Sequence, residues 1–313
     1  MGEAEANRRI AEWKQGTILN LSNLGLTSLQ NFTLPSTLRE LDCSYNRLTS
    51  LPTLPSTLTY LDCYNNLLTS LPTLPSTLTA LYCDNNQLTS LPTLVSTLTN
   101  LYCYINQLTS LPTLPSTLTK LYCSNNQLTS LPTLPSTLTT LYCYNNQLTS
   151  LPTLPSSLEV LYCGNNQLTS LPTLPSSIES LWCCINQLTS LPTLPSSLTH
   201  LFCYNNNKLT SLPTLPSSLT HLFCYNNQLT SLPTIPSSIT YLECKDNPFS
   251  LETPRVENET PHEYYTRLES VQSRLRTIKR NRDIKEELMM VCWHPSKVQK
   301  LIDYYGIDYD DYV

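Results

Sequence analysis

Cysteine is the residue type in this chain that most strongly invites a chemical function. The sequence has 313 residues and 13 cysteines, and eleven of them recur every 20 residues, with one step of 21. Thiols in such a series could bind a metal, form disulfides or act as nucleophiles. The eleven are Cys43, Cys63, Cys83, Cys103, Cys123, Cys143, Cys163, Cys183, Cys203, Cys224 and Cys244. Which chemistry is open to them depends on the elements that carry them.

Each of these cysteines occupies the same place in a repeated unit. Residues 58–77 read LTYLDCYNNLLTSLPTLPST, and eleven copies fit the skeleton L-x-x-L-x-C-x-x-N-x-L-x-x-L-P-x-L-P-x-x. They start at residues 38, 58, 78, 98, 118, 138, 158, 178, 198, 219 and 239. Leu61 and Cys63 alternate with Tyr60 and Asp62, which predicts a short strand with one inward and one outward face. The paired prolines favour an extended, polyproline-like return segment.

Stacking of the copies decides what the cysteines can do. One coil cannot bury its leucines alone, so we expect a solenoid of coils with parallel strands about 4.8 Å apart. The cysteines then form one column whose parallel side chains leave the Cβ atoms farther apart than the roughly 3.8 Å of a disulfide. A line of thiols also lacks the four convergent ligands of a structural zinc site. We predict reduced, buried cysteines that fill the core, with no metal and no cofactor.

Two other cysteines stand outside this column. Cys184 follows Cys183 and points to the outward strand face, so we expect it to be the one repeat thiol that could react. The run Cys292-Trp293-His294 suggests a nucleophile beside a base. Neighbours in sequence are not thereby arranged for catalysis, however, and no supporting Asn or Asp is identifiable. Neither cysteine identifies a catalytic site.

Histidine and glycine give no stronger signal of an enzyme. His200 and His221 share one outward position in adjacent copies, where a two-histidine metal site is conceivable. The flanking copies place Ser180 and Tyr241 at that position, so we favour solvated, stacked histidines. The five glycines are not clustered, and no glycine-rich phosphate loop exists. We predict that the chain is not an enzyme.

Aromatic residues dominate the outward strand face. The position between Leu and Cys is aromatic in eight successive copies, and the position two residues later adds a second partial stripe that also holds Tyr64. Exposed contiguous aromatics usually mark a binding surface, and seven steps of 4.8 Å make this strip about 35 Å long. We expect Asp42, Asp62 and Glu243 to flank the strip as an acidic border. The predicted partner-binding residues are Tyr82, Tyr102, Tyr104, Tyr122, Tyr142, Tyr144, Tyr162, Trp182, Phe202, Tyr204, Phe223 and Tyr225.

A plainer interpretation of the strip stays open. Tandem duplication could have copied one tyrosine, with neighbouring rings stacking to stabilise the sheet. Another outward position varies from copy to copy, and we expect it to carry specificity. Its residues include Ala80, Asn100, Lys120, Thr140, Val160 and Ser180.

The pattern LxxLxCxxNxLxxL resembles the leucine-rich repeat, with Cys where many members carry Leu or Val. Over residues 19–249, the L-P-x-L-P continuation and the 20-residue period resemble the short repeats of effectors secreted by enteric bacteria. Together with a tail containing CWHPSKVQKLIDYY, the repeats are also similar to leucine-rich-repeat proteins of giant DNA viruses of amoebae. The resemblance implies an α/β solenoid whose parallel β-sheet lines a concave, protein-binding face. The ligase domain of the bacterial effectors has a Cys-x-Asp motif that the tail lacks, so that activity is not carried over.

We predict three segments along the chain: an N-terminal capping helix (1–17), the solenoid with a degenerate first coil and eleven repeats (18–250), and a helical C-terminal cap or tail (251–313). A solenoid needs caps because its end coils would otherwise expose leucine. Apolar spacing indicates a helix over 3–14 that stops at Gly16. Thr260-Pro261-His262-Glu263 has the form of a capping box ahead of a helical apolar stripe.

Charge and hydropathy restrict the partner and the compartment. The net charge is -5, which gives no footprint for nucleic acid. Residues 38–247 hold only 5 Lys/Arg and 8 Asp/Glu, so Ser, Thr and Asn solvate most of that surface. We see no secretory signal and no run of eighteen apolar residues, so we expect no membrane contact. We expect a monomer in the cytoplasm, which for a viral protein is the host cytoplasm.

Together these observations predict a non-enzymatic scaffold that binds a protein partner through the aromatic face. Two alternatives are kept open. The first is an adaptor or enzyme-associated module, for example in the ubiquitin pathway, that works through the C-terminal tail. The second is a carbohydrate-binding module, because aromatic strips can stack on sugars.

Overall fold

The computed structural model describes residues 2–230, 232–244 and 246–248. Its contacts separate two units, Met1–Ile239 with Cys244–Thr253 and Thr240–Glu243 with Pro254–Val313. The described element of the second unit is strand β12 (Tyr241–Glu243). The account below concerns the first unit. The predicted C-terminal helices and Cys292 lie outside the described residues.

The first unit begins with helix α1 (Gly2–Glu12). Glu3 and Glu5 lie in its first turn and Arg9 in its last, which complements the helix dipole. Ala6 is fully buried against the array. The helix ends two residues before the predicted end, and Gly16 follows in a left-handed conformation with a φ of 89°. The predicted N-terminal helix is therefore present.

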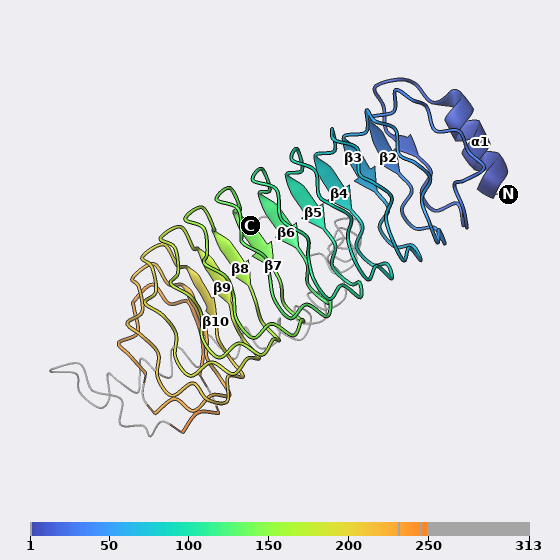
Figure 1. The fold of residues 1–313 in the computed structure, drawn as a ribbon. Helices are drawn as coiled ribbons and strands as arrows, with labels where there is room; N and C mark the ends of the chain where they lie inside the picture. The colour runs from blue at the N-terminus through green and yellow to red at the C-terminus, as the bar shows by residue number, and fades with distance from the viewer. Residues whose placement is uncertain (1, 231, 245, 249–313) are drawn as a thin grey trace. The chain divides into compact units, whose positions relative to one another are not determined.

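Eleven strands follow α1 and form a parallel sheet in chain order (Figure 1). Each strand lies beside the strand of the next coil, and Leu61, for example, is in register with Leu41 and Leu81. The strands are β1 (Leu19–Asn20), β2 (Glu40–Asp42), β3 (Tyr60–Asp62), β4 (Ala80–Tyr82), β5 (Asn100–Tyr102), β6 (Lys120–Tyr122), β7 (Thr140–Tyr142), β8 (Val160–Tyr162), β9 (Ser180–Trp182), β10 (His200–Phe202) and β11 (His221–Phe223).

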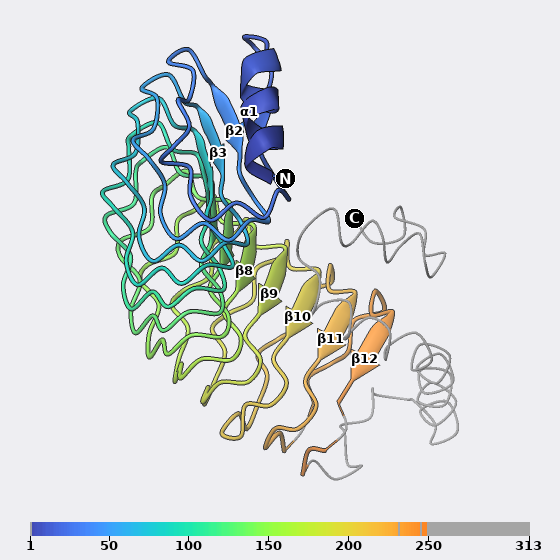
Figure 2. The same cartoon turned by 90° about the vertical axis from the view of Figure 1, so that its right-hand side faces the viewer.

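The strands line the inner side of the curve of this unit, and the return segments form its outer side (Figure 2). Leu61 and Cys63 have no exposed surface, so the leucine and cysteine positions point into the core as predicted. The return segments contain no helix, in keeping with their prolines. The predicted leucine-rich-repeat solenoid is thereby confirmed.

An asparagine in each repeat, buried or half-buried, fastens its coil to the neighbouring coil. The Asn66 side-chain amide donates to the carbonyls of Cys43 and Cys63, each at 3.1 Å. Its Oδ1 accepts the Leu48 amide at 2.9 Å. Backbone groups that the turn leaves unpaired are thus satisfied, which matters because a buried orphan group costs about 1–3 kcal/mol. In the degenerate first coil, Leu24 stands at this position, and Asn46 of the next coil accepts the Leu24 amide at 3.1 Å.

The residue before each of these asparagines has a positive φ, between 48° and 56° from coil to coil. We call these residues the rim. They are Tyr45, Asn65, Asn85, Ile105, Asn125, Asn145, Asn165, Ile185, Asn205, Asn226 and Asp246. Asparagine tolerates this left-handed region better than other residues with a side chain, which explains its frequency here.

The two irregular copies keep the coil intact. Val95 replaces a proline, yet its carbonyl still accepts the Leu98 amide at 3.1 Å, as Pro55 does for Leu58. The extra residue at 207–208 is absorbed in a turn, where the Leu209 amide donates to Asn206 at 2.9 Å. Within the described part of the chain, no helix is long and apolar enough to cross a membrane.

Candidate protein-binding face

Three columns of side chains point outward from the strands of the first unit. The aromatic column contains Tyr82, Tyr102, Tyr122, Tyr142, Tyr162, Trp182, Phe202 and Phe223, preceded by Asp42 and Asp62. The variable column starts each strand and runs from Glu40 to His221. The mixed column lies just after the strands and contains Ser44, Tyr64, Asp84, Tyr104, Ser124, Tyr144, Gly164, Cys184, Tyr204 and Tyr225.

The aromatic column is a continuous stack of rings. Neighbouring centroids are 4.1–4.7 Å apart along its seven steps. Most pairs are close to parallel; the Trp182–Phe202 pair is tilted by 35°, and the Tyr122–Tyr142 pair has an interplanar angle of 61°. Every ring is half-buried. Burial raises the pKa of Tyr82 to about 12, so its hydroxyl is neutral at physiological pH.

This stacking decides what the column offers to a ligand. The ring faces are covered by neighbouring rings, so the edges and the phenol hydroxyls are what remain for contact. The five tyrosines from Tyr82 to Tyr162 present hydroxyl groups, whereas Trp182, Phe202 and Phe223 present mainly apolar edges. The column therefore changes from hydrogen-bonding to apolar along its length. The predicted stacking of neighbours is present, and it is compatible with a binding role.

Large and small residues alternate in the mixed column, and this arrangement departs from the predicted exposed stripe. Tyr64 is only 6% exposed, while Tyr104, Tyr144, Tyr204 and Tyr225 are half-buried. The small residues between the tyrosines are buried, so the large side chains cover them. Tyr204 and Tyr225 stack at 4.5 Å where two large residues are adjacent.

Cys184 is buried in the mixed column, so the expectation of a reactive outward thiol is wrong. Its side chain is 5% exposed, and its Sγ lies 2.9 Å from where a Cβ on Gly164 would be. Cys184 thus fills the space that the neighbouring glycine leaves. Burial raises the pKa of its thiol to about 11, which disfavours the nucleophilic thiolate.

Acidic residues close the N-terminal end of the face, and two of them are buried. Asp62 is 9% exposed, and burial raises the pKa of its carboxyl to about 7. Asp84 is 2% exposed, its pKa is raised to about 8 by the same cause, and its Oδ2 has no hydrogen-bond partner. The sequence analysis predicted that Asp62 is a solvated residue at the border of the aromatic strip, and it overlooked Asp84. The signal for Asp84 was an aspartate at an outward position between Tyr64 and Tyr104.

The histidine pair stacks as predicted. The rings of His200 and His221 have centroids 4.3 Å apart, and each Nδ1 pairs with the hydroxyl of the preceding threonine, Thr199 or Thr220, at 2.7 and 2.8 Å. Among the described residues, no group of three or more His, Cys, Asp or Glu side chains could hold a metal ion.

The twelve described cysteines are free thiols. The core column is buried, and desolvation raises the pKa of Cys123 to about 12. Some of the thiols donate weak hydrogen bonds to the next coil, as Cys63 does to the Tyr82 carbonyl at 3.3 Å. Their chemistry in the fold is therefore that of small core residues, in line with the prediction.

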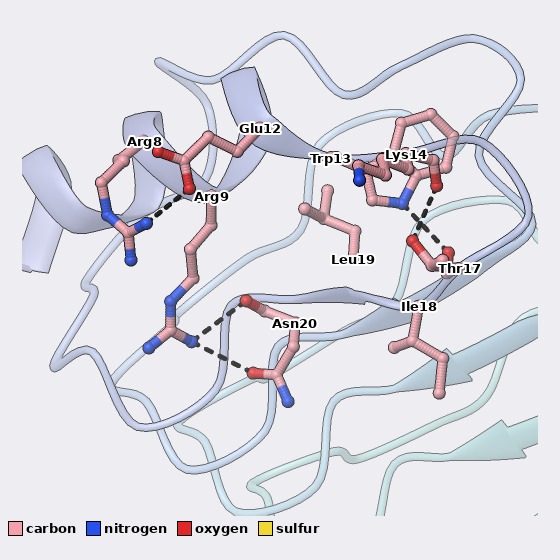
Figure 3. A pocket seen from close by; sticks show the side chains of 9 residues that line it. All are labelled: Arg8, Arg9, Glu12, Trp13, Lys14, Thr17, Ile18, Leu19 and Asn20. Carbon is pink, nitrogen blue, oxygen red and sulfur yellow. Dashed lines mark hydrogen bonds and ion pairs between the residues drawn. The ribbon is translucent and has the colours of Figure 1, made fainter.

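A hollow of about 420 Å³ at the N-terminal end lies between α1 and β1 (Figure 3). Its lining residues are Arg8, Arg9, Glu12, Trp13, Lys14, Thr17, Ile18, Leu19 and Asn20. Arg8 pairs with Glu5 at 2.7 Å, and Arg9 donates to the Asn20 carbonyl at 3.1 Å. Arg8 thus braces the helix and Arg9 joins the helix to β1, so the hollow belongs to the cap. Sequence reasoning did not foresee it.

A family model and the structures of known proteins both match this chain to leucine-rich-repeat proteins. The model of "Leucine Rich repeats (2 copies)" matches residues 36–76, 116–156 and 136–176. The structure of YopM, a leucine-rich effector protein from Yersinia pestis, aligns with 30% identity and a TM-score of 0.59, covering 82% of this chain and 91% of YopM. YopM from Yersinia enterocolitica aligns with 34% identity and a TM-score of 0.58 over 72% of this chain, which spans only 58% of that protein.

A more distant structure has the same fold. The functional domain of InlJ from Listeria monocytogenes, which includes a cysteine ladder, aligns with 24% identity and a TM-score of 0.56. The alignment covers 77% of this chain and 64% of that one. No curated protein sequence matches the chain.

Proposed function

The chain belongs to the leucine-rich-repeat proteins, and we propose that it is a non-enzymatic scaffold that binds another protein through the outward face of its strands. Solenoids of stacked repeats present extended concave surfaces that they use for binding, and YopM, which has the same fold, is a leucine-rich effector protein. The proposal names the aromatic column and the tyrosines of the mixed column as the contact surface. It places the interaction in the cytoplasm, where free thiols persist.

The observation that carries the proposal is the aromatic column itself. Eight half-buried aromatic side chains lie in register on one face, and neighbouring rings keep each other in place at 4.1–4.7 Å. Rigid aromatic side chains lose little conformational entropy on binding, which is why Tyr and Trp are frequent interface anchors. The surface is therefore preorganised for a macromolecular partner.

The change along the column indicates the chemistry of that partner. The hydroxyls from Tyr82 to Tyr162 favour hydrogen-bonding groups on the partner, and the ring edges from Trp182 to Phe223 favour apolar side chains on it. Sugar stacking is disfavoured, because a sugar ring needs the open face of an aromatic ring and these faces are occupied. We therefore prefer a protein to a carbohydrate as the ligand.

The adaptor alternative rests on residues 251–313 and has no support from the described part of the chain. It would predict partners that bind whether or not the strand face is intact. The two functions are thus separable by substitutions on the face alone.

A photo-crosslinking experiment tests the proposal on the full chain. A photoreactive amino acid replaces Tyr142 on the face or, as the matched control, Thr133, which is exposed on a return segment. In cytosol we expect a defined crosslinked protein from position 142 only. With the photoreactive residue kept at position 142, the added substitutions Tyr122→Ala and Trp182→Ala should each reduce crosslinking of that protein about tenfold. Equal crosslinking from position 133, or crosslinking that neither substitution changes, would contradict the strand-face proposal.

A further inference from the structure

Two isoleucines lie on the rim where asparagine is the rule. Ile105 and Ile185 have φ values of 51° and 53°, in the left-handed region. A β-branched residue is a genuine outlier there, because its branched Cβ crowds the backbone. Backbone strain of this kind persists where the surrounding structure enforces it, and it is concentrated at functional positions.

The isoleucines also interrupt a row of side-chain hydrogen bonds along the rim. Asn145 donates to Asn125 at 2.7 Å, and Asn226 donates to Asn205 at 2.6 Å. The amide of Asn85 likewise donates to Asn65, at 3.1 Å. Isoleucine has no group that can continue this row. Compared with an asparagine at the same position, each isoleucine therefore adds backbone strain and lacks a hydrogen bond.

Burial does not compensate for these costs. The side chains of Ile105 and Ile185 are 44% and 42% exposed, and they are among the few large apolar residues exposed in the described part of the chain. They are four coils apart, which corresponds to about 19 Å at 4.8 Å per coil. Each follows, by three residues, the aromatic residue that ends its strand, Tyr102 in β5 and Trp182 in β9.

We propose that Ile105 and Ile185 are apolar anchors for the partner that the strand face binds, an inference that rests on the function proposed above. The partner segment presents two apolar side chains about 19 Å apart. From the start of each strand to the rim, the five coils from one anchor to the other carry a single charge, that of Lys120, and the exposed Glu159 and Glu179 lie just before their strands. The segment that lies across them is therefore nearly uncharged, since an unpaired charge would be desolvated without a counterion.

The test uses a defined probe, a displayed library of random 20-residue peptides selected on the full chain. The enriched peptides are synthesised, and their Kd values are measured for five proteins. These are the wild type, the double variants Ile105→Asn/Ile185→Asn and Ile105→Gly/Ile185→Gly, the variant Tyr142→Ala and the control Leu67→Gln. Leu67 is 42% exposed but is absent from the rim and has no positive φ, so it controls for loss of an exposed apolar side chain.

We expect the double variant to be more stable and to bind less. Relief of strain should raise Tm by about 2–4 °C per substitution, while the Kd for the enriched peptides should rise at least tenfold. Leu67→Gln should change neither quantity. The pair Ile105→Gly/Ile185→Gly relieves the strain without adding an amide, so it should weaken binding to the same degree.

Each other outcome is decisive. A lower Tm for both the Asn and the Gly pairs, or unchanged Kd values in them, overturns the anchor proposal. Peptides that lose affinity in Tyr142→Ala but not in the rim variants overturn it while leaving the strand-face function standing. Peptides indifferent to all these substitutions, or the absence of any enriched peptide, contradict the strand-face function as well.

Discussion

The inward and outward positions of the sheet are adjacent on the same strands, yet they follow different rules. On β7, Leu141 points inward and is fully buried, whereas Tyr142 points outward and is half-buried. The leucine recurs in every coil from β1 to β11, and the cysteine two residues later does so from β2 to β11. The outward positions hold aromatic, acidic, hydroxyl and basic residues instead.

The inward and outward columns therefore repeat their residue types for different reasons. The inward columns are uniform because every coil must present the same volume to its neighbours in a close-packed core. The outward columns are not constrained by packing to the same degree. A residue type that nevertheless recurs there, such as tyrosine in the aromatic column, needs another reason, which here is ring stacking and, in our proposal, binding.

The largest expected effect is at Leu141. Leu141→Ala should lower the free energy of unfolding by about 3 kcal/mol, because it leaves a cavity in the core. Tyr142→Ala, one residue away, should cost only about 1 kcal/mol, the value of a partly exposed aromatic contact. Urea denaturation of both variants measures the contrast. Equal costs would remove the distinction between the two faces.

The asparagines that join the coils extend the inward rule to a polar residue, and the half-buried Asn126 tests it. Its amide donates to the carbonyls of Cys103 and Cys123 at 3.0 and 3.1 Å, and its Oδ1 accepts the Leu108 amide at 3.0 Å. Asn126→Ala should cost about 2–3 kcal/mol, because these backbone groups lose their partners. The exposed neighbour Gln127 is the control, and Gln127→Ala should stay within about 0.5 kcal/mol of the wild type. A cost that small for Asn126→Ala would show that the asparagine does not fasten the coils.

The smallest effect is the pH dependence of stability caused by Asp84, which lies at an outward position but is buried. The raised pKa of Asp84, about 8, means that the folded protein favours its protonated form. Its contribution to stability is complete below the ordinary pKa near 4 and is lost as the pH rises to about 8. We expect the contribution of Asp84 to the free energy of unfolding to fall by about 1 kcal/mol between pH 7 and pH 8.5, and Asp84→Asn to remove that part of the fall.

The measurement for Asp84 is urea denaturation at pH 5, 7 and 8.5. Asp62 is the nearest titrating carboxyl, with a pKa of about 7, so the residual slope in Asp84→Asn reports on it. The hydroxyl of Tyr104 bonds to the Asp84 carboxyl and Tyr64 lies on its other side in the column, and both phenols stay neutral over this range. A wild-type slope that Asp84→Asn leaves unchanged would mean that other groups cause it.

Much of the solenoid could be predicted because its rules are local to one coil. Alternation of Leu61 and Cys63 with Tyr60 and Asp62 gave the strand and its two faces, and the prolines gave an extended return segment. Because eleven copies show the same pattern, a position that is ambiguous in one copy could be assigned from the others. The N-terminal helix was also visible from its apolar spacing, although its end was two residues off because the last turn of a helix frays.

The candidate site was harder to predict because exposure depends on residues one coil away. Cys184 looked outward and accessible, but Gly164 in the preceding coil leaves the space that it fills. Asp84 is buried between tyrosines that lie 20 residues before and after it. The strain at Ile105 and Ile185 was also invisible, because the left-handed φ of the rim belongs to the coil geometry rather than to the residue type.

The sequence by itself determined the coil, its core-facing leucines and cysteines, and the parallel stacking, because a 20-residue unit with these spacings has one way to bury its apolar side chains. Only the tertiary structure decided which outward side chains meet solvent. In a stack of coils, the neighbours of each outward residue are 20 residues away in both directions. Whether that residue is covered or exposed therefore follows from the relative sizes of three side chains that the chain brings together only when the coils have stacked.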